Sequence, residues 1–332
     1  MLEFQNYLGI LYAEKENYII EKKIGDGASS QCFKCFSFSN KNKFAVKLYL
    51  ENNIKEYLTE IDILSKLKND NIIKLIDYGE GILRINERNE NSNQLFIYQK
   101  NNNTKINFEI IEFLEKGEIF DYIYYPRQGF SEEISKIIFS QILNAIEYCH
   151  LNNISHCDIK PENLLLNDNF EIKLIDFGYS KYFNKDKLIK GWKGTRIYAS
   201  PELYKNNLNG FNGEKNDIFS LGVFLYVLVI GKFPFENAHF SDKNYKYFIN
   251  KDYDNFWKKC KINLSSEFKD LINHIFCYEP DKRLSILEIK NHQWMNNIGE
   301  FKDYSYQKEF EYRKIIVDIR KNTVDTIKNK RT

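Results

Sequence analysis

The chain has 332 residues, of which 43% are hydrophobic and 16% aromatic, so it is long enough to bury a sizeable core in one or two domains. Its formal net charge of +2 points neither to a nucleic-acid partner nor to a membrane surface. The six cysteines are scattered and the start lacks a basic and apolar leader, which predicts free thiols in a reducing compartment, expected to be the cytoplasm with the nucleus left open. The longest apolar run, 221–230, is interrupted at Gly222 and is much shorter than the roughly 20 residues of a membrane span, so we expect a buried helix there.

Residues 1–17 show no clear pattern and are expected to form a leader ahead of the first strand, in the sense of an N-terminal extension and not of a targeting signal. Strand signals begin at Tyr18 and continue through Gly25 and Gly27 to Cys32. Glycines permit a tight turn whose backbone N–H groups approach phosphate oxygens closely. Taken alone, Gly25-x-Gly27 is better explained as a plain hairpin turn. Cys32 and Cys35 could supply half of a metal site, but no second pair completes it, which favours ordinary buried thiols.

A lysine lies in the middle of the next apolar strand, 44–48. Lys47 is costly to bury without an anion, and the helical apolar spacing of residues 54–67 offers Glu60 as its partner, with Glu56 as a rival at the same four-residue spacing. Residues 79–107 are rich in asparagine, so we expect a partly disordered insertion with a candidate strand at 94–99, and we favour a solvated loop over a docking site.

Two helices and a catalytic-looking stretch follow the strand at 106–111. One helix opens after Lys116 and another at Ser131, whose hydroxyl and following glutamates suit an N-terminus. Residues 156–163 and 176–178 form two turns joined by a hairpin, which brings Asp158, Asn163 and Asp176 together. Carboxylate and amide oxygens suit Mg²⁺, and a carboxylate can accept a proton, so the pattern indicates phosphoryl transfer. The alternative is that these residues merely punctuate turns.

The ordered set resembles a eukaryotic protein kinase of the serine/threonine type. Residues 283–295, Arg-Leu-Ser-Ile-Leu-Glu-Ile-Lys-Asn-His-Gln-Trp-Met, are most similar to the calcium/calmodulin-dependent kinase group. The resemblance implies an α+β, two-lobed protein-kinase-like fold, with a small antiparallel β lobe plus one helix and a large, mainly helical lobe. It places the kinase domain at 18–295, the small lobe at about 18–111 with the insertion at about 79–107, the large lobe at about 115–295, and a helical tail at 296–332.

The resemblance also assigns site residues, with ATP and Mg²⁺ as cofactors and proteins as substrates. Asp158 would orient the substrate hydroxyl and accept its proton, Lys160 would steady the γ-phosphate, and Asn163 and Asp176 would hold the metal. The peptide would meet Glu118, Glu162 and Thr195. The residues expected to bind ATP are Ile24, Gly25, Asp26, Gly27, Ala28, Ser29, Ser30, Cys32, Ala45, Lys47, Glu60, Glu112, Leu114 and Leu165.

Departures from the family pattern carry predictions of their own. Ser30 replaces the third glycine, Cys32 replaces a valine, and the link from Lys47 to the following helix is short, so its first turn is expected to be clipped. Cys157 replaces the arginine that clamps an activation-segment phosphate, and residues 181–194 contain no serine or threonine. We therefore predict activity without phosphorylation there. Glu118 and Glu162 predict a modest preference for basic residues upstream of the phosphosite, although Val227 stands where some members carry an acid.

Other residues have structural roles in the resemblance. Glu202 should pair with Arg283, Asp217 should bind the backbone of the catalytic loop, and an apolar column should contain Leu64, Leu75, His156 and Phe177. The tail has apolar Ile315, Ile316 and Ile319 beside basic residues, so it could bind calmodulin, block the cleft, or pack on the large lobe, which we favour. A pseudokinase scaffold and a small-molecule kinase are the competing classes, but no catalytic position is missing.

Overall fold

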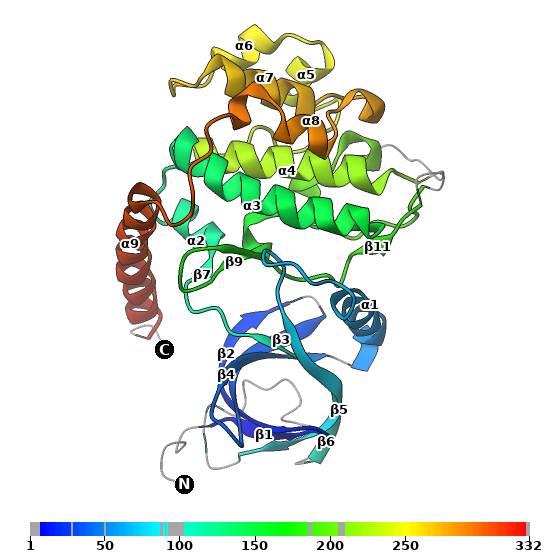
Figure 1. The fold of residues 1–332 in the computed structure, drawn as a ribbon, viewed down its shortest axis with the longest axis vertical. Helices are drawn as coiled ribbons and strands as arrows, with labels where there is room; N and C mark the ends of the chain where they lie inside the picture. Colours follow the sequence, from blue (N-terminus) through cyan, green and yellow to red (C-terminus); the bar gives the residue numbers. More distant parts are fainter. Residues whose placement is uncertain are drawn as a thin grey trace. The chain divides into compact units, whose positions relative to one another are not determined.

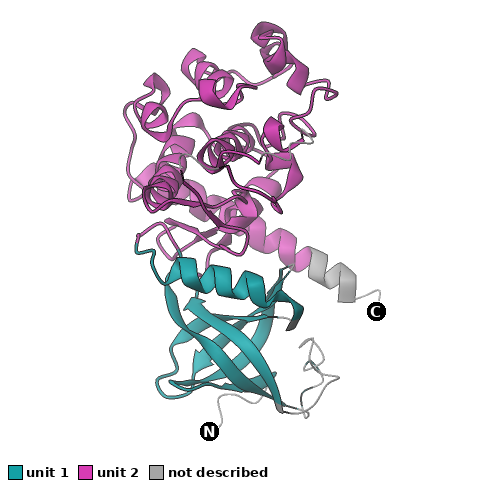
Figure 2. Ribbon diagram, turned by 90° about the vertical axis from the view of Figure 1, so that its right-hand side faces the viewer, with its two compact units in different colours: residues 1–68, 73–113 teal, residues 69–72, 114–332 magenta. Residues whose placement is uncertain are grey.

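The computed structural model describes residues 7–27, 29–49, 51–86, 89, 91, 103–184, 188–204 and 210–329. The chain divides into two compact units (Figure 2). Met1–Lys68 and Ile73–Phe113 make the first, which we call the barrel unit, and Asn69–Ile72 and Leu114–Thr332 make the second, which we call the helical unit. A β unit with one helix and a mainly helical unit confirm the predicted fold class.

The barrel unit is a closed antiparallel barrel with strand order β1-β2-β3-β4-β6-β5 (Figure 1). Alternate residues of each strand point inward, and they fill the barrel with a core that includes Leu11, Ile20, Phe33, Val46 and Phe108. The strands are β1 (Gly9–Tyr12), β2 (Asn17–Asp26), β3 (Ser30–Ser37), β4 (Lys43–Tyr49), β5 (Leu75–Ile85) and β6 (Asn103–Glu112).

Strand β1 lies in the part of the chain that the sequence marked only as a leader. It pairs with β2 on one side and with β5 on the other, so that Gly9 lies opposite both Ile20 and Ile85. Leu8 and Leu11 are buried. The leader therefore closes the barrel and covers two strand edges that would otherwise be open. Residues 1–6 lie outside the described part.

The flanks of the expected insertion are strand and not loop, so the predicted boundaries at 79 and 107 are wrong. Strands β5 and β6 pair from Leu75 to Arg84, because Leu83 and Ile85 point inward while polar neighbours such as Glu80 face solvent and pair with Lys105 at 2.9 Å. The possible strand at 94–99 lies outside the described residues.

Among the described residues of the barrel unit, α1 (Ile54–Leu64) is the one α-helix. A 3₁₀ turn (Glu51–Asn53) directly precedes it and stands where the sequence predicted a clipped first turn. The helix buries Tyr57, Glu60 and Ile61 on the face that meets the sheet.

The helical unit is built around α3 (Glu132–Leu151) and α4 (Gly213–Ile230), which lie side by side (Figure 1). Helix α3 begins where predicted, because the Ser131 hydroxyl accepts a hydrogen bond from the backbone N–H of Ile134. Residues 216–230 of α4 are all buried, which confirms the predicted buried helix. A Cβ at Gly222 would lie 2.3 Å from Cγ2 of Ile275, so close packing of α7 (Ser266–Ile275) on α4 explains the glycine in the apolar run.

The other elements of the helical unit are short, apart from the last helix. A hairpin of β9 (Leu164–Leu166) and β10 (Ile172–Leu174) turns at Asn167, whose side chain accepts hydrogen bonds from the N–H groups of Asn169 and Glu171. The remaining elements are β7 (Gly117–Glu118), β8 (Ile154–Ser155), β11 (Lys181–Tyr182), α2 (Ile119–Tyr124), α5 (Tyr245–Ile249), α6 (Tyr253–Trp257), α8 (Ile286–Lys290) and α9 (Tyr304–Asn329). Within the described residues, none of the helices has the length and apolar character needed to cross a membrane.

Candidate active site

The catalytic loop of the helical unit runs from β8 to β9. Its Asp158 carboxylate accepts four hydrogen bonds. Asp158 is 3% exposed. Its Oδ1 accepts hydrogen bonds from the backbone N–H and the hydroxyl of Thr195, both at 2.8 Å. Its Oδ2 accepts from Nζ of Lys160 at 2.7 Å and from Nδ2 of Asn163 at 3.1 Å. Charge-assisted bonds of this kind hold the carboxylate in one orientation.

The fully buried Asp217 of α4 holds the catalytic loop through hydrogen bonds to its backbone. Its carboxylate accepts hydrogen bonds from the backbone N–H groups of His156 and Cys157, both at 2.9 Å, which confirms the predicted contact. The same carboxylate lies 2.9 Å from Nε2 of His150. Cys157 has a φ of +66°, a strained value for this residue type that such contacts must stabilise.

The two expected metal residues are linked through the backbone. Nδ2 of Asn163 donates hydrogen bonds to the backbone carbonyl and to Oδ2 of Asp158, so the side-chain oxygen of Asn163 is the atom that could bind a metal. The backbone carbonyl of Asn163 accepts a hydrogen bond from the N–H of Ile175, the residue before Asp176. A carboxylate and a carboxamide oxygen are hard ligands, and Mg²⁺ binds through one or two carboxylates together with substrate phosphates. The residues therefore fit this metal.

His156 is a packing residue, as the sequence predicted. It is fully buried, its ring lies 4.9 Å from that of Phe177, and Nε2 is 3.1 Å from the carbonyl oxygen of Ile175. Leu64 and Leu75, the other predicted members of the apolar column, belong to the barrel unit, so the column as a whole remains a prediction.

In the barrel unit, Lys47 pairs with Glu60, as predicted. Nζ of Lys47 lies 2.6 Å from both carboxylate oxygens of Glu60, which is 1% exposed. Two residues that the sequence did not reveal join this pair, because the Tyr49 hydroxyl lies 2.7 Å from Glu60 and 2.7 Å from Glu109. The only sequence signal was a tyrosine and a glutamate at positions of otherwise apolar strands.

The other residues expected to bind ATP are divided between the two units. The glycine-rich turn lies between β2 and β3, where the N–H of Gly27 donates to the carbonyl of Ser30 at 2.8 Å, and Ala28 lies outside the described residues. Ile24, Gly25, Asp26, Ser29, Cys32, Ala45 and Glu112 belong to the barrel unit, and Leu114 and Leu165 to the helical unit. Their common contact with one nucleotide stays a prediction.

The two glutamates expected to meet a basic substrate residue lie in an acidic environment. Burial, reinforced by the charge of Asp121, raises the pKa of Glu118 to about 7. Burial also raises the pKa of Glu162, and one of its carboxylate oxygens is buried without a hydrogen-bond partner. A buried carboxylate oxygen in this state is suited to a cationic ligand.

The activation segment packs on Cys157 through apolar contacts. Cys157, Ile189 and Phe211 form a buried cluster, with Phe183, Trp192 and Leu203 packed around it. Ile189 and Phe211 exchange two backbone hydrogen bonds of 2.8 and 3.0 Å, and Nε1 of Trp192 donates to the carbonyl of Cys157. An apolar cluster thus lies at the position where the family places an arginine.

The predicted structural ion pair is present. Arg283, 2% exposed, donates from both terminal nitrogens to the two carboxylate oxygens of Glu202, at 2.8 and 2.6 Å. Its remaining donors bind the carbonyls of Cys277, Lys215 and Tyr278. All of these hydrogen bonds lie within the helical unit, so the pair fixes the end of the activation segment to the helices.

The tail forms α9, which lies along α2 (Figure 1). The buried face is not the one that the sequence singled out, since Ile315 and Ile319 are about 60% exposed. Tyr306, Phe310 and Val317 are buried instead, together with Arg313. Arg313 donates to the carbonyls of Tyr122, Gln128 and Gly129, and its guanidinium lies 3.8 Å from the centre of the Phe130 ring.

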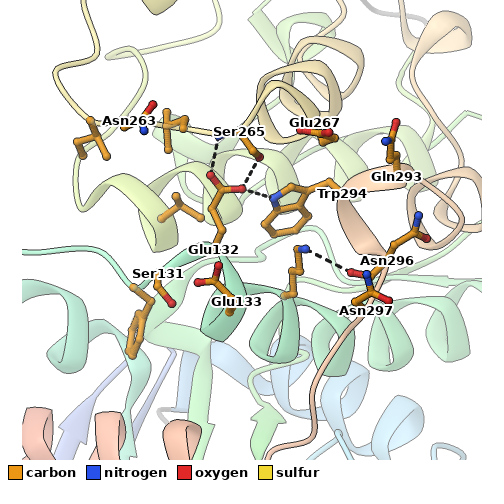
Figure 3. Close-up of a pocket in the computed structure, with 15 residues that line it drawn as sticks. Ser131, Glu132, Glu133, Asn263, Ser265, Glu267, Gln293, Trp294, Asn296 and Asn297 are labelled. Carbon is orange, nitrogen blue, oxygen red and sulfur yellow. Dashed lines mark hydrogen bonds between the residues drawn. The ribbon is translucent and has the colours of Figure 1, made fainter.

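A polar pocket of about 600 Å³ lies away from these residues, between the start of α3 and the segment around Trp294 (Figure 3). The Glu132 carboxylate in its wall accepts hydrogen bonds from the backbone and hydroxyl of Ser265 and from the indole of Trp294. These contacts tie α3 to α7, so Glu132 has a structural role.

Comparison with known proteins identifies the architecture. The family model of the protein kinase domain matches residues 18–295. The chain belongs to the protein kinase family. Similar proteins include the probable serine/threonine-protein kinase MARK-B of Dictyostelium discoideum, 33% identical over 91% of this chain and 38% of the relative. The serine/threonine-protein kinase SIK3 homolog of Danio rerio is 31% identical over 84% of this chain and 21% of the relative, and the NUAK family SNF1-like kinase 1 of Mus musculus is 32% identical over 85% and 39%.

These matches confirm the predicted enzyme class, an ATP-dependent protein kinase of the serine/threonine type. The resemblance to the calcium/calmodulin-dependent group is consistent with them. The chain spans less than two fifths of the length of the first two relatives, so what the whole relatives act on does not transfer to it.

Proposed function

We propose that this kinase transfers the γ-phosphate of ATP to serine or threonine hydroxyls of proteins, with Asp158 as the residue that receives the substrate proton. The observation that carries this proposal is the convergence of Lys160, Asn163 and Thr195 on the Asp158 carboxylate. Catalysis of phosphoryl transfer is mostly positioning and charge stabilisation, and these contacts supply both within one unit.

In the proposed step, the substrate hydroxyl oxygen forms a bond to the γ-phosphorus while the bond from that phosphorus to the bridging oxygen of ADP breaks. The hydroxyl proton passes to Asp158. Lys160 places its ammonium beside the transferred phosphoryl group, and Lys47, fixed by Glu60, binds the α- and β-phosphates. Asn163 and Asp176 would hold Mg²⁺, which supplies charge neutralisation on the phosphates when bound.

The isosteric substitution Asp158→Asn tests this role, with Asp168→Asn in the exposed β9–β10 turn as the matched control. We expect Asp158→Asn to lower kcat by at least about 10³-fold while thermal stability stays close to that of the wild type, and the control to keep full activity. Near-normal turnover by Asp158→Asn would refute the assignment.

We also propose that the enzyme is active without phosphorylation of the activation segment. The apolar cluster of Cys157, Ile189 and Phe211 supports this, because it fixes the segment without a phosphate. Phosphatase treatment should leave activity unchanged. Ile189→Ala should lower activity several-fold, whereas Leu188→Ala, at a residue that is 45% exposed, should not. An enzyme silenced by phosphatase would contradict the proposal.

A modest preference for basic residues upstream of the phosphosite is the proposed specificity. It is supported by the buried, unpartnered oxygen of Glu162 and by the neighbouring Glu118. Peptides with an upstream arginine should have a higher kcat/KM than matched alanine peptides. Equal phosphorylation of peptides with and without that arginine on a peptide array would contradict the proposal.

For the tail, we propose a packing role, supported by the burial of Phe310 and Arg313 against the helical unit. Calmodulin binding and autoinhibition remain as alternatives, and the ion pair of Lys321 with Asp121, near Glu118, is the contact through which the tail could compete with a basic substrate. Lys321→Ala should leave activity on a basic peptide unchanged if the tail only packs. A rise in activity would instead show autoinhibition.

A further inference from the structure

Helix α2 is short, and its last turn lacks a hydrogen-bond donor. It spans only Ile119–Tyr124, and an isolated helix of this length is unstable in water. In a continuing helix the carbonyl of Tyr122 would accept a hydrogen bond from the N–H of residue 126, but this residue is Pro126, which has no N–H. The chain then turns through Arg127, whose φ of +57° lies in the left-handed region. The end of α2 therefore needs support from another segment.

Arg313 of α9 supplies the missing donors. Its Nη1 donates to the carbonyls of Tyr122 at 2.8 Å and Gln128 at 2.7 Å, and its Nη2 donates to the carbonyl of Gly129 at 2.7 Å. The side chain is 4% exposed, and its Nε donates to the carboxylate of Glu309 on the same helix at 2.6 Å. A cation at the carboxyl end of a helix also interacts favourably with the last carbonyls. One buried guanidinium thus holds both the end of α2 and the loop that follows it.

Tyr122 links this contact to the substrate side of α2. The residue is fully buried, and its hydroxyl donates to the backbone carbonyl of Lys116 at 2.9 Å. Lys116 lies two residues before Glu118, which is the N-cap residue of α2 and pairs with Leu165 of β9. The backbone of Tyr122 is therefore held by α9, while its side chain holds the start of the segment that carries Glu118.

Helix α2 also meets the second glutamate of the proposed peptide site. It packs on the 3₁₀ turn Pro161–Asn163, which contains Glu162. Burial raises the pKa of Glu118 to about 7, and the charges of Asp121 and Glu162 contribute to this shift, so the two glutamates lie close enough to interact. The attraction between charges falls with distance. The position of α2 therefore affects how strongly both carboxylates can act on one substrate cation.

We propose that Arg313 is a positioning residue for the recognition of a basic substrate residue, because it fixes α2 and, through Tyr122, the segment that carries Glu118. The inference rests on the proposed preference of Glu118 and Glu162 for a cation upstream of the phosphosite. Helix α9 then supports the peptide site in addition to covering the helical unit. Autoinhibition by the tail makes the opposite prediction, because a loosened α9 would then raise activity on a basic peptide.

Steady-state kinetics of the full chain with a matched pair of peptides test the proposal. The two peptides differ only in an arginine or an alanine upstream of the phosphosite. Arg313→Gln removes the guanidinium, and Arg320→Gln, at an exposed arginine of the same helix, is the control. In R313Q we expect the kcat/KM of the arginine peptide relative to that of the alanine peptide to fall at least about twofold, through a higher KM for the arginine peptide. R320Q should keep the wild-type ratio.

Tyr122→Phe tests the same link with a smaller change, because it removes only the hydroxyl that binds the carbonyl of Lys116. It should lower the same ratio, and it takes the place of R313Q if that variant does not fold. Hydrogen exchange reports on α2 without reference to activity. Amides of residues 119–130 should exchange faster in R313Q than in R320Q, because the carbonyls that Arg313 binds lose their donor.

The proposal is overturned if R313Q, or Y122F in its place, keeps the wild-type preference for the arginine peptide. It is also overturned if both peptides lose activity by the same factor, which is the result of a purely structural role, or if the arginine peptide is phosphorylated faster. A wild type that does not distinguish the two peptides refutes the proposed preference and with it this inference. That result differs from the other failures, because they leave the preference of the wild type intact.

Discussion

The substitution Phe310→Ala tests whether α9 is packed as a part of the helical unit. Phe310 is fully buried, and its ring centre lies 4.7 to 5.4 Å from those of Tyr306, Phe130, Phe170 and Tyr122. Removing a buried phenylalanine ring costs about 3–5 kcal/mol, because both its transfer free energy and its packing are lost. With a denaturant slope of about 3 kcal/mol per molar urea, a loss of this size should lower the unfolding midpoint by about 1 to 1.7 M.

The control is Tyr312→Ala, two residues further along α9 and 61% exposed. It removes an aromatic ring of similar size from the outer face of the same helix, so the free energy of unfolding should change by no more than about 0.5 kcal/mol. Urea unfolding followed by tryptophan fluorescence and by circular dichroism compares the two variants. Equal midpoints for Phe310→Ala and Tyr312→Ala would refute the packing of α9 on the helical unit.

Two further predictions concern charge. Because burial raises the pKa of Glu118 to about 7, its negative charge develops as the pH rises through that value. The kcat/KM of an arginine peptide relative to that of an alanine peptide should therefore increase between about pH 6 and about pH 8. In Glu118→Gln this ratio should change little with pH. The folded pKa also lies above the unfolded value, so the contribution of Glu118 to stability falls as the pH rises toward about 7. Arg283→Met leaves the Glu202 carboxylate buried without its cation and should destabilise the protein by about 3–5 kcal/mol, whereas Lys282→Met, at an exposed neighbour, should change stability little in calorimetry; equal effects would contradict a buried pair.

The sequence predicted those parts of the molecule in which a residue type has few alternatives. A lysine inside an apolar strand needs an anion, and Glu60 on the following helix supplies it. Ser131 ahead of two glutamates marks the start of α3. An aspartate early in α4 binds the catalytic loop through backbone N–H groups, as the resemblance implied.

What the sequence missed depends on contacts between distant segments. Strand β1 is four residues long and has no turn signal before it, so its pairing with β5 could not be foreseen. In α9 the sequence singled out Ile315 and Ile319, whereas Phe310 is buried, because the buried face depends on where the aromatic rings of the helical unit lie. Tyr49 and Glu109 meet only because β4 and β6 are neighbours in the barrel.

The central claim is that this chain phosphorylates serine or threonine through Asp158. Mass spectrometry of a protein substrate incubated with Mg-ATP and either the wild type or Asp158→Asn tests it most directly. We predict phosphoserine or phosphothreonine with the wild type and none with the variant. Phosphotyrosine as the main product, or equal phosphorylation by both enzymes, would contradict the account.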